Sequence, residues 1–136
     1  MTAIAIANSA YVDLARIEGI EVLPVTLAAA VTRGQVGYQS TAGFGVADAN
    51  DSGKEQARGI YLDNGAIGGT VSLVKRGILS GYGVSGLDDD ALLYLSDTAG
   101  ALDDGAGTMT VVCGRVLTLQ NVKMVYVDFD WTVIWA

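Results

Sequence analysis

Hydrophobic and polar residues alternate with a period of two in several stretches, and the longest alternation lies near the C-terminal end. Between Met124 and Trp135, large apolar residues occupy every second position, with Ile134 as the exception on the other face. The alternation predicts one long strand that buries a single face. The apolar positions of that face are Val125, Val127, Phe129, Trp131, Val133 and Trp135. The two tryptophans either help this strand to close a barrel or sandwich, or cover a surface between subunits.

Shorter apolar runs, separated by glycine and polar clusters, predict further strands. Ile20 to Val31 contains Pro24, which has no N–H to donate and is therefore expected at a sheet edge or a bulge. The other expected strands cover residues 35–39, 44–47, 57–62, 70–75, 78–79 and 109–119, with a bend at Arg76-Gly77 and a break at Gly114-Arg115.

A short motif occurs twice. Gly37 to Gly43 reads GYQSTAG, and Leu93 to Gly100 reads LYLSDTAG. A glycine beside an arginine and a β-branched residue follows each copy, in the segments 58–60 and 114–116. The order and spacing predict one β-unit used twice, in residues 20–80 and 86–136, joined by the glycine-rich stretch 80–86. The alternative is a chance match, because such residues are common where strands turn.

Residues 1–19 precede the first predicted unit. Asn8-Ser9 can cap a short helix that Gly19 would close, and an extended arm is the other interpretation. The predicted organisation is therefore an arm over residues 1–19 and a single β-domain over residues 20–136. The predicted fold is all-β, a small β-barrel or β-sandwich built from two similar halves, with an N-terminal arm or short helix.

Within the arm, one uncharged segment is the candidate site for a partner. Its isoleucines alternate with alanines, so it can add as a strand to an exposed sheet edge of another chain. The alternative is that both isoleucines fill the protein's own core. The predicted partner-binding residues are Thr2, Ala3, Ile4, Ala5, Ile6, Ala7 and Asn8.

The composition restricts the classes of function. Acidic residues outnumber basic ones by 15 to 8, the net charge is −7, and Lys75-Arg76 is the one adjacent basic pair. Binding to nucleic acid or to an anionic membrane needs basic clusters, so neither is expected as a partner. The chain has no histidine, which excludes Ser-His-Asp triads, Cys-His dyads and histidine-ligated zinc. Cys113 lies in an apolar run, where a buried small hydrophobe is expected.

The acidic residues cluster in turns beside glycine. Asp48, Asn50 and Ser52 with Gly53 imitate the start of a calcium loop, but Gly59 stands where a bidentate glutamate is required. We therefore expect no metal, no cofactor and no enzymatic activity. Met1 to Ile6 lacks a basic leader and a long apolar run, which predicts a soluble protein made in the cytoplasm.

Four stretches of strand and turn residues carry a family resemblance: residues 57–62, 68–77, 92–100 and 112–117. Together they resemble the capsid decoration proteins of tailed bacteriophages, also called cement or head-stabilising proteins, and the resemblance extends over residues 20–135. It implies a non-enzymatic protein on the outer surface of the virion head that clamps neighbouring major capsid subunits against DNA pressure, as a homotrimer. Two other functions stay open: a tail or head-fibre module that binds host carbohydrate through exposed Tyr82, Trp131 or Trp135, and a β-barrel enzyme with convergent acids.

Overall fold

The strands lie close to where the sequence pattern predicts them. The structure is a computed structural model that describes residues 3–6, 12–16 and 19–135. In these residues it contains ten strands and no helix, so the predicted all-β fold is confirmed. The strands are β1 (Asp13–Leu14), β2 (Glu21–Thr26), β3 (Val36–Ser40), β4 (Gly43–Val46), β5 (Ala57–Tyr61), β6 (Thr70–Ser80), β7 (Leu92–Leu95), β8 (Leu102–Asp103), β9 (Val112–Leu119) and β10 (Val122–Asp128).

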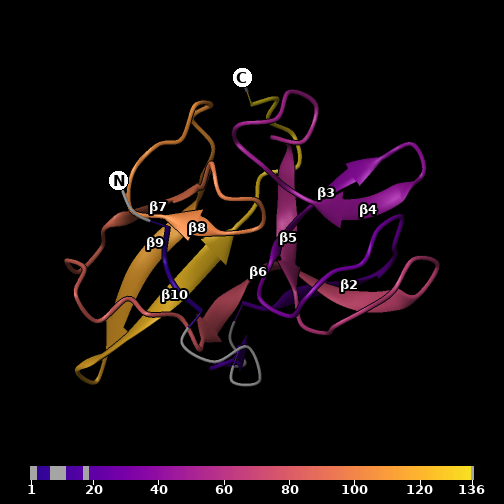
Figure 1. Ribbon diagram of the computed structural model, residues 1–136. Helices are drawn as coiled ribbons and strands as arrows, with labels where there is room; N and C mark the ends of the chain where they lie inside the picture. The colour runs from indigo at the N-terminus through magenta and orange to yellow at the C-terminus, as the bar shows by residue number, and fades with distance from the viewer. Residues whose placement is uncertain (1–2, 7–11, 17–18, 136) are drawn as a thin grey trace.

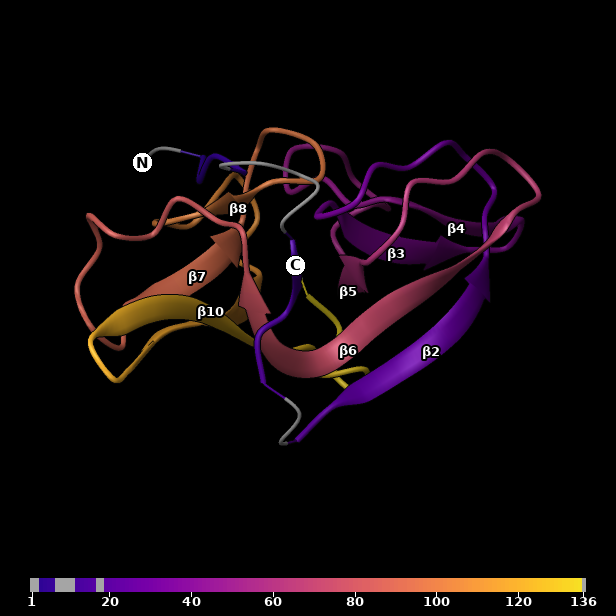
Figure 2. The ribbon, with the colours of Figure 1, turned by 90° about the horizontal axis from the view of Figure 1, so that it is seen from below.

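All ten strands belong to one curled antiparallel sheet (Figure 1). The order along its main path is β4-β3-β5-β6-β10-β9-β7-β8, and β1 and β2 also pair with β6. β6 joins the two parts of the molecule, with β2 to β5 on one side and β7 to β10 on the other (Figure 2). β6 therefore continues through the bend expected at Arg76-Gly77 as a single curved strand.

The two copies of the repeated motif occupy matching places in the sheet. The pairing orders β4-β3-β5-β6 and β8-β7-β9-β10 are the same. In each part the register shifts at the tyrosine, between Gly37 and Tyr38 on β3 and between Leu93 and Tyr94 on β7. The residues Gly37 and Leu93 pair with Gly59 and Gly114 respectively. That the two parts, residues 20–80 and 86–136, arose by duplication stays a prediction.

Both motif serines also form the same local turn. The Ala42 N–H donates to Ser40 Oγ at 3.3 Å, and the Thr98 N–H donates to Ser96 Oγ at 3.0 Å. Such side-chain turns end a strand by offering the backbone a partner outside the ladder. The repeated motif thus ends its strand with the same kind of turn in both copies.

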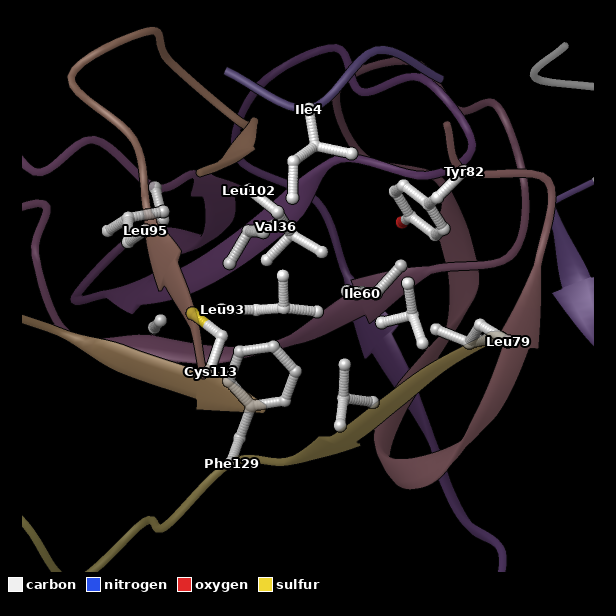
Figure 3. Packing of buried hydrophobic residues seen from close by; sticks show 14 of the residues in the cluster. Ile4, Val36, Ile60, Leu79, Tyr82, Leu93, Leu95, Leu102, Cys113 and Phe129 are labelled. Atoms are coloured by element: carbon white, nitrogen blue, oxygen red, sulfur yellow. The ribbon is translucent and has the colours of Figure 1, made fainter. Parts of the chain in front are cut away.

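One large hydrophobic cluster fills the curve of the sheet, and a smaller cluster lies between β2, β4, β5 and β6. The large cluster takes side chains from both parts of the molecule, including Val36, Ile60, Leu79 and Leu93 (Figure 3). The smaller one surrounds Tyr61 and Leu73. Because the large cluster takes residues from both parts, they share this cluster and do not pack as separate units. β6 contributes to both clusters.

The long strand predicted from Met124 to Trp135 is wrong beyond Asp128. Val125, Val127 and Phe129 are buried as predicted. The strand then ends because the Asp130 carboxylate accepts hydrogen bonds from the Thr132 N–H at 2.9 Å and the Thr132 hydroxyl at 2.6 Å. This local turn takes the chain out of the ladder.

Three further expectations concern local structure. Pro24 pairs with Ser72 of β6, and among the described residues β2 has β6 as its one strand partner, so the edge position is confirmed. The break expected at Gly114-Arg115 is wrong, because β9 continues through both residues. The short helix is wrong for residues 12–16, where Asp13 and Leu14 form a strand instead; residues 7–11 and 17–18 lie outside the described residues.

Candidate interaction surfaces

The predicted N-terminal site is partly built into the protein's own sheet. The Ile4 N–H donates to the Leu102 carbonyl at 2.7 Å, and the Ala5 carbonyl accepts from the Gly83 N–H at 2.8 Å. The Ile4 side chain is 7% exposed and points into the large core cluster (Figure 3). These contacts are those that the core-packing alternative requires.

The other residues of that site are less enclosed or lie outside the described residues. Ala5 is exposed, and the segment 3–6 borders an open groove of about 290 Å³ together with Gln35 and residues 98–101. Thr2, Ala7 and Asn8 fall outside the described part of the chain. Partner binding through Thr2 to Asn8 therefore stays a prediction, although Ile4 is already used by the core.

A second surface lies on the outward face of β6, β10 and β9. In antiparallel pairs, directly opposed residues share a face. Tyr126 is opposed to Ile78, and Met124 is opposed to Leu117. Their neighbours Val125 and Val127 point into the core, so these four side chains lie on the opposite face, where Ile78 is buried and the other three are half-buried. The outward face of this sheet therefore carries an apolar group, although a solvated sheet face is usually polar. Arg115, opposed to Tyr126, and Arg76, opposed to Asp128, lie on the same face.

Charged residues border this outward apolar face. A groove of about 380 Å³ crosses it between Ile78, Leu117 and Tyr126, and the exposed Arg115 and Asp90 line its rim. Arg115 and Asp90 form an ion pair at 3.5 Å. Burial, followed by the nearby Asp128 carboxylate, raises the pKa of Tyr126. Its phenol is therefore neutral at pH 7 and donates to Asp128 Oδ2 at 3.5 Å.

A third surface is the gap where β6 and β10 separate. Their pairing ends at Val125 and Leu79, although β10 begins at Val122 and β6 continues to Ser80. Gly81 follows β6 with φ +94°, a left-handed conformation that suits glycine. Tyr82 then turns inward, and its hydroxyl donates to the Gly34 carbonyl at 2.7 Å. We call this gap of about 270 Å³ the fork; its lining residues are Leu79, Ser80, Gly81, Tyr82, Val84, Val122, Lys123, Met124 and Val125.

The segment after β10 lies across the start of β5 and is held through its backbone. The Gln56 side chain accepts from the Trp135 N–H at 2.9 Å and donates to the Trp135 carbonyl at 2.8 Å. The Arg58 guanidinium donates to the Asp130 carbonyl at 3.3 Å. Ile134 projects from this segment and is 86% exposed.

The aromatic residues proposed for carbohydrate binding have other partners. The prediction that Tyr82 is an exposed aromatic is wrong, because its ring is buried in the core. Trp131 is half-buried; its indole N–H donates to the Arg58 carbonyl at 2.7 Å, and its ring lies 6.5 Å from that of Phe44. Trp135 is half-buried as well. A stacking platform for a sugar needs a free aromatic face, and the buried ring of Tyr82 does not provide one.

Cys113 has the environment expected from its sequence context. It is fully buried, and burial raises the pKa of its thiol well above the ordinary value. Because the thiolate is the nucleophilic form, this cysteine is inert at pH 7.

The acidic turns are held by internal hydrogen bonds. Asp97 accepts from the Thr108 N–H at 2.7 Å and the Thr108 hydroxyl at 2.9 Å, and Asp48 accepts from the Asn50 N–H at 2.9 Å. The buried Asp103 accepts from Ser96 Oγ at 3.0 Å. Across the described ranges, no three acidic or cysteine side chains converge in a way that could hold a metal ion.

Comparison with known protein families, with curated proteins and with solved structures found no match. Among the described residues there is also no helix long and apolar enough to cross a membrane.

The sequence reasoning did not identify the outward apolar face or the fork. A signal for the face was present, because Met124 and Tyr126 interrupt the polar phase of the β10 alternation and Leu117 continues an apolar run. The fork had no such signal. It depends on where two strands distant in sequence stop pairing.

Proposed function

We propose that this protein is a non-enzymatic capsid decoration protein of a tailed bacteriophage, which binds the outside of the mature head as a homotrimer and clamps neighbouring major capsid subunits. The family resemblance of the four sequence stretches motivates the proposal. The observation that supports a binding role is the outward face of β6, β9 and β10, where half-buried Leu117, Met124 and Tyr126 lie around the buried Ile78. Apolar side chains gathered on one outer face mark an interaction site.

The arrangement of this face suits a protein partner. Ile78, Leu117, Met124 and Tyr126 provide an apolar centre, and the Arg115–Asp90 ion pair lies at its rim. Protein interfaces combine an apolar centre with a polar rim in this way. No specific contact favours the alternative of carbohydrate adhesion, because Tyr82 is buried and the Trp131 indole N–H is already paired.

Co-sedimentation with phage heads tests the proposal. The purified chain is mixed with heads of the phage whose genome encodes it, and the bound fraction is measured at increasing chain concentration. We expect saturable binding, with copies grouped around three-fold positions in a reconstruction of the decorated head. A gene neighbourhood without portal, protease and major capsid genes, or isolated copies away from any three-fold axis, would contradict the proposal.

A matched pair of variants connects binding to the outward apolar face. Leu117→Glu places a charge at the half-buried centre of that face, whereas Ile67→Glu places it on a loop residue that is 73% exposed. We expect Leu117→Glu to abolish binding to heads and Ile67→Glu to leave it unchanged. Thermal melting of both variants shows whether Leu117→Glu still folds. If it melts normally and still binds, this face is not the interface.

A further inference from the structure

The fork between β6 and β10 exposes two strand edges that face each other without pairing. The β6–β10 ladder ends at the pair Leu79 and Val125, so it does not include residues 122–124 of β10. β10 retains β9 along its other edge through Val122. Its residues 122–124 therefore present an open edge toward the fork, and an open edge is a template for another strand.

The β9–β10 hairpin is built to hold that edge in place. Gln120 and Asn121 connect the two strands, with φ values of 52° and 65°. Two consecutive left-handed residues form the tight turn that matches the twist of a two-stranded hairpin. Leu119 pairs directly with Val122 across this turn. The open edge is thus rigid before any partner arrives, which lowers the entropic cost of binding.

The floor of the fork is apolar and its chemistry selects an apolar side chain. Leu79, Val84 and Val125 are buried beneath the gap, and Val122 beside it is 57% exposed. Val122 and Met124 also belong to the strand that carries the outward apolar face, so the fork continues from that face. A partner that covers the face can extend into the fork without leaving the surface.

The positive charge of Lys123 at the fork indicates which kind of residue should lie next to the apolar side chain of such a partner. Among the described residues that line it, Lys123 carries a charge and none is acidic. Lys123 Nζ donates to the backbone carbonyls of Leu87 and Ser85, which are neutral partners. An ammonium group has three donors, so one donor and the full positive charge stay available in a chain of net charge −7.

We propose that the fork binds an extended segment of the partner chain, which adds as a strand to residues 122–124 of β10. An apolar side chain of that segment enters the gap above Leu79 and Val125, and an acidic residue beside it pairs with Lys123. Backbone hydrogen bonds provide affinity and the alternate side chains provide selectivity. This inference rests on the proposed function only for the identity of the partner, which is the head surface. The chemistry expected of the partner segment follows from the fork itself.

A peptide probe tests the fork independently of any phage head. The probe is a synthetic octapeptide of alternating valine and threonine with one aspartate, titrated into the ¹⁵N-labelled full chain. We expect the amide signals of residues 80–82 and 122–124 to shift. The same peptide with N-methylated backbone amides on its pairing edge should cause no shift, because it cannot donate to β10. Shifts elsewhere, equal shifts with the methylated peptide, or no shift at millimolar concentration would overturn the proposal.

Variants then test the same site on heads. Val122→Asp introduces repulsion toward an acidic segment, and Lys123→Gln keeps a donor for the Leu87 carbonyl but removes the charge. Ile67→Asp is the matched control, since Ile67 is also an exposed apolar residue. We expect about fivefold weaker binding for Lys123→Gln, a larger loss for Val122→Asp, and no change for Ile67→Asp.

The outcomes separate the two proposals. If heads bind the unmodified chain and both fork variants equally well, the fork is not used and the proposed function stands. If heads do not bind the unmodified chain, the proposed function fails and the peptide titration alone decides the fork. Concentration-dependent shifts at residues 122–124 without peptide would mean that a second copy occupies the fork, which also overturns the proposal.

Discussion

A β-carbon at Gly37 would lie 2.5 Å from the phenol oxygen of Tyr61, so the tyrosine ring fills the space that a side chain on residue 37 would need. The same hydroxyl donates to the Gly45 carbonyl at 2.6 Å. One buried ring on β5 therefore contacts both β3 and β4, and it stabilises the smaller hydrophobic cluster.

Removing this hydroxyl should weaken the fold. We expect Tyr61→Phe to lower the free energy of unfolding by about 1–3 kcal/mol, because a buried hydrogen bond is lost and a carbonyl loses its partner. Urea denaturation followed by circular dichroism measures the change. Tyr94→Phe, at a half-buried tyrosine of β7, is the control and should change stability by less than about 0.5 kcal/mol. Equal effects of the two substitutions would contradict this role of Tyr61.

Gly114 should tolerate no side chain. A β-carbon there would overlap the Tyr126 carbonyl oxygen on the adjacent strand, and backbone cannot rotate away as a side chain can. We expect Gly114→Ala to cost about 3 kcal/mol or more, since overpacking would force β9 and β10 apart. Gly86→Ala is the matched control, because nothing lies within 4 Å of a β-carbon at Gly86. Denaturation midpoints that agree for the two variants would refute the predicted clash.

The N-terminal segment should contribute to stability through Ile4. We expect Ile4→Ala to cost about 2–5 kcal/mol, because it leaves a cavity in the large cluster. Deletion of residues 2–8 should lower the melting temperature as well, whereas Ala5→Ser at an exposed position should not. Normal melting of Ile4→Ala combined with lost binding to heads would instead favour a partner-binding arm.

Stability should decline in alkali partly because of Cys113. Burial raises the pKa of this thiol above its ordinary value of 9.0, so above pH 9 the unfolded chain releases a proton that the folded chain retains. The free energy of unfolding is then constant below about pH 8 and falls by up to about 1.4 kcal/mol per pH unit above pH 9.

Urea denaturation between pH 8 and pH 10 checks this dependence. Cys113→Ala should lower stability at every pH but remove this part of the slope. Tyr61 and Tyr82 have raised pKa values too, and their effect begins above their ordinary value of 10.0. The same slope between pH 8 and pH 10 in both proteins would exclude Cys113 as its source.

Local patterns in the sequence determined most of the strand positions. The alternation in residues 124–129, the glycine-punctuated runs and the apolar context of Cys113 all depend on neighbours within a few residues. The alternation, the burial of Cys113 and the edge position of Pro24 agree with the structure, whereas the glycine break expected at Gly114-Arg115 does not. A period of two is a property of the extended backbone itself, so it is visible without knowledge of the partner strands.

Tertiary structure alone decided which of these segments meet. The alternation of residues 130–135 is that of a strand, yet the Asp130–Thr132 turn ends β10. Gln56 and Arg58, more than 70 residues earlier, then bind the segment that follows. Glycines flank Tyr82, which suggests an exposed loop, but its hydroxyl finds a carbonyl on Gly34 inside the core. The Ile4 side chain is buried in the same cluster as Leu102, about 100 residues later, and the Ile4 N–H donates to the Leu102 carbonyl. Such contacts join residues far apart in the chain, and their free energy depends on geometry that no local window of the sequence contains.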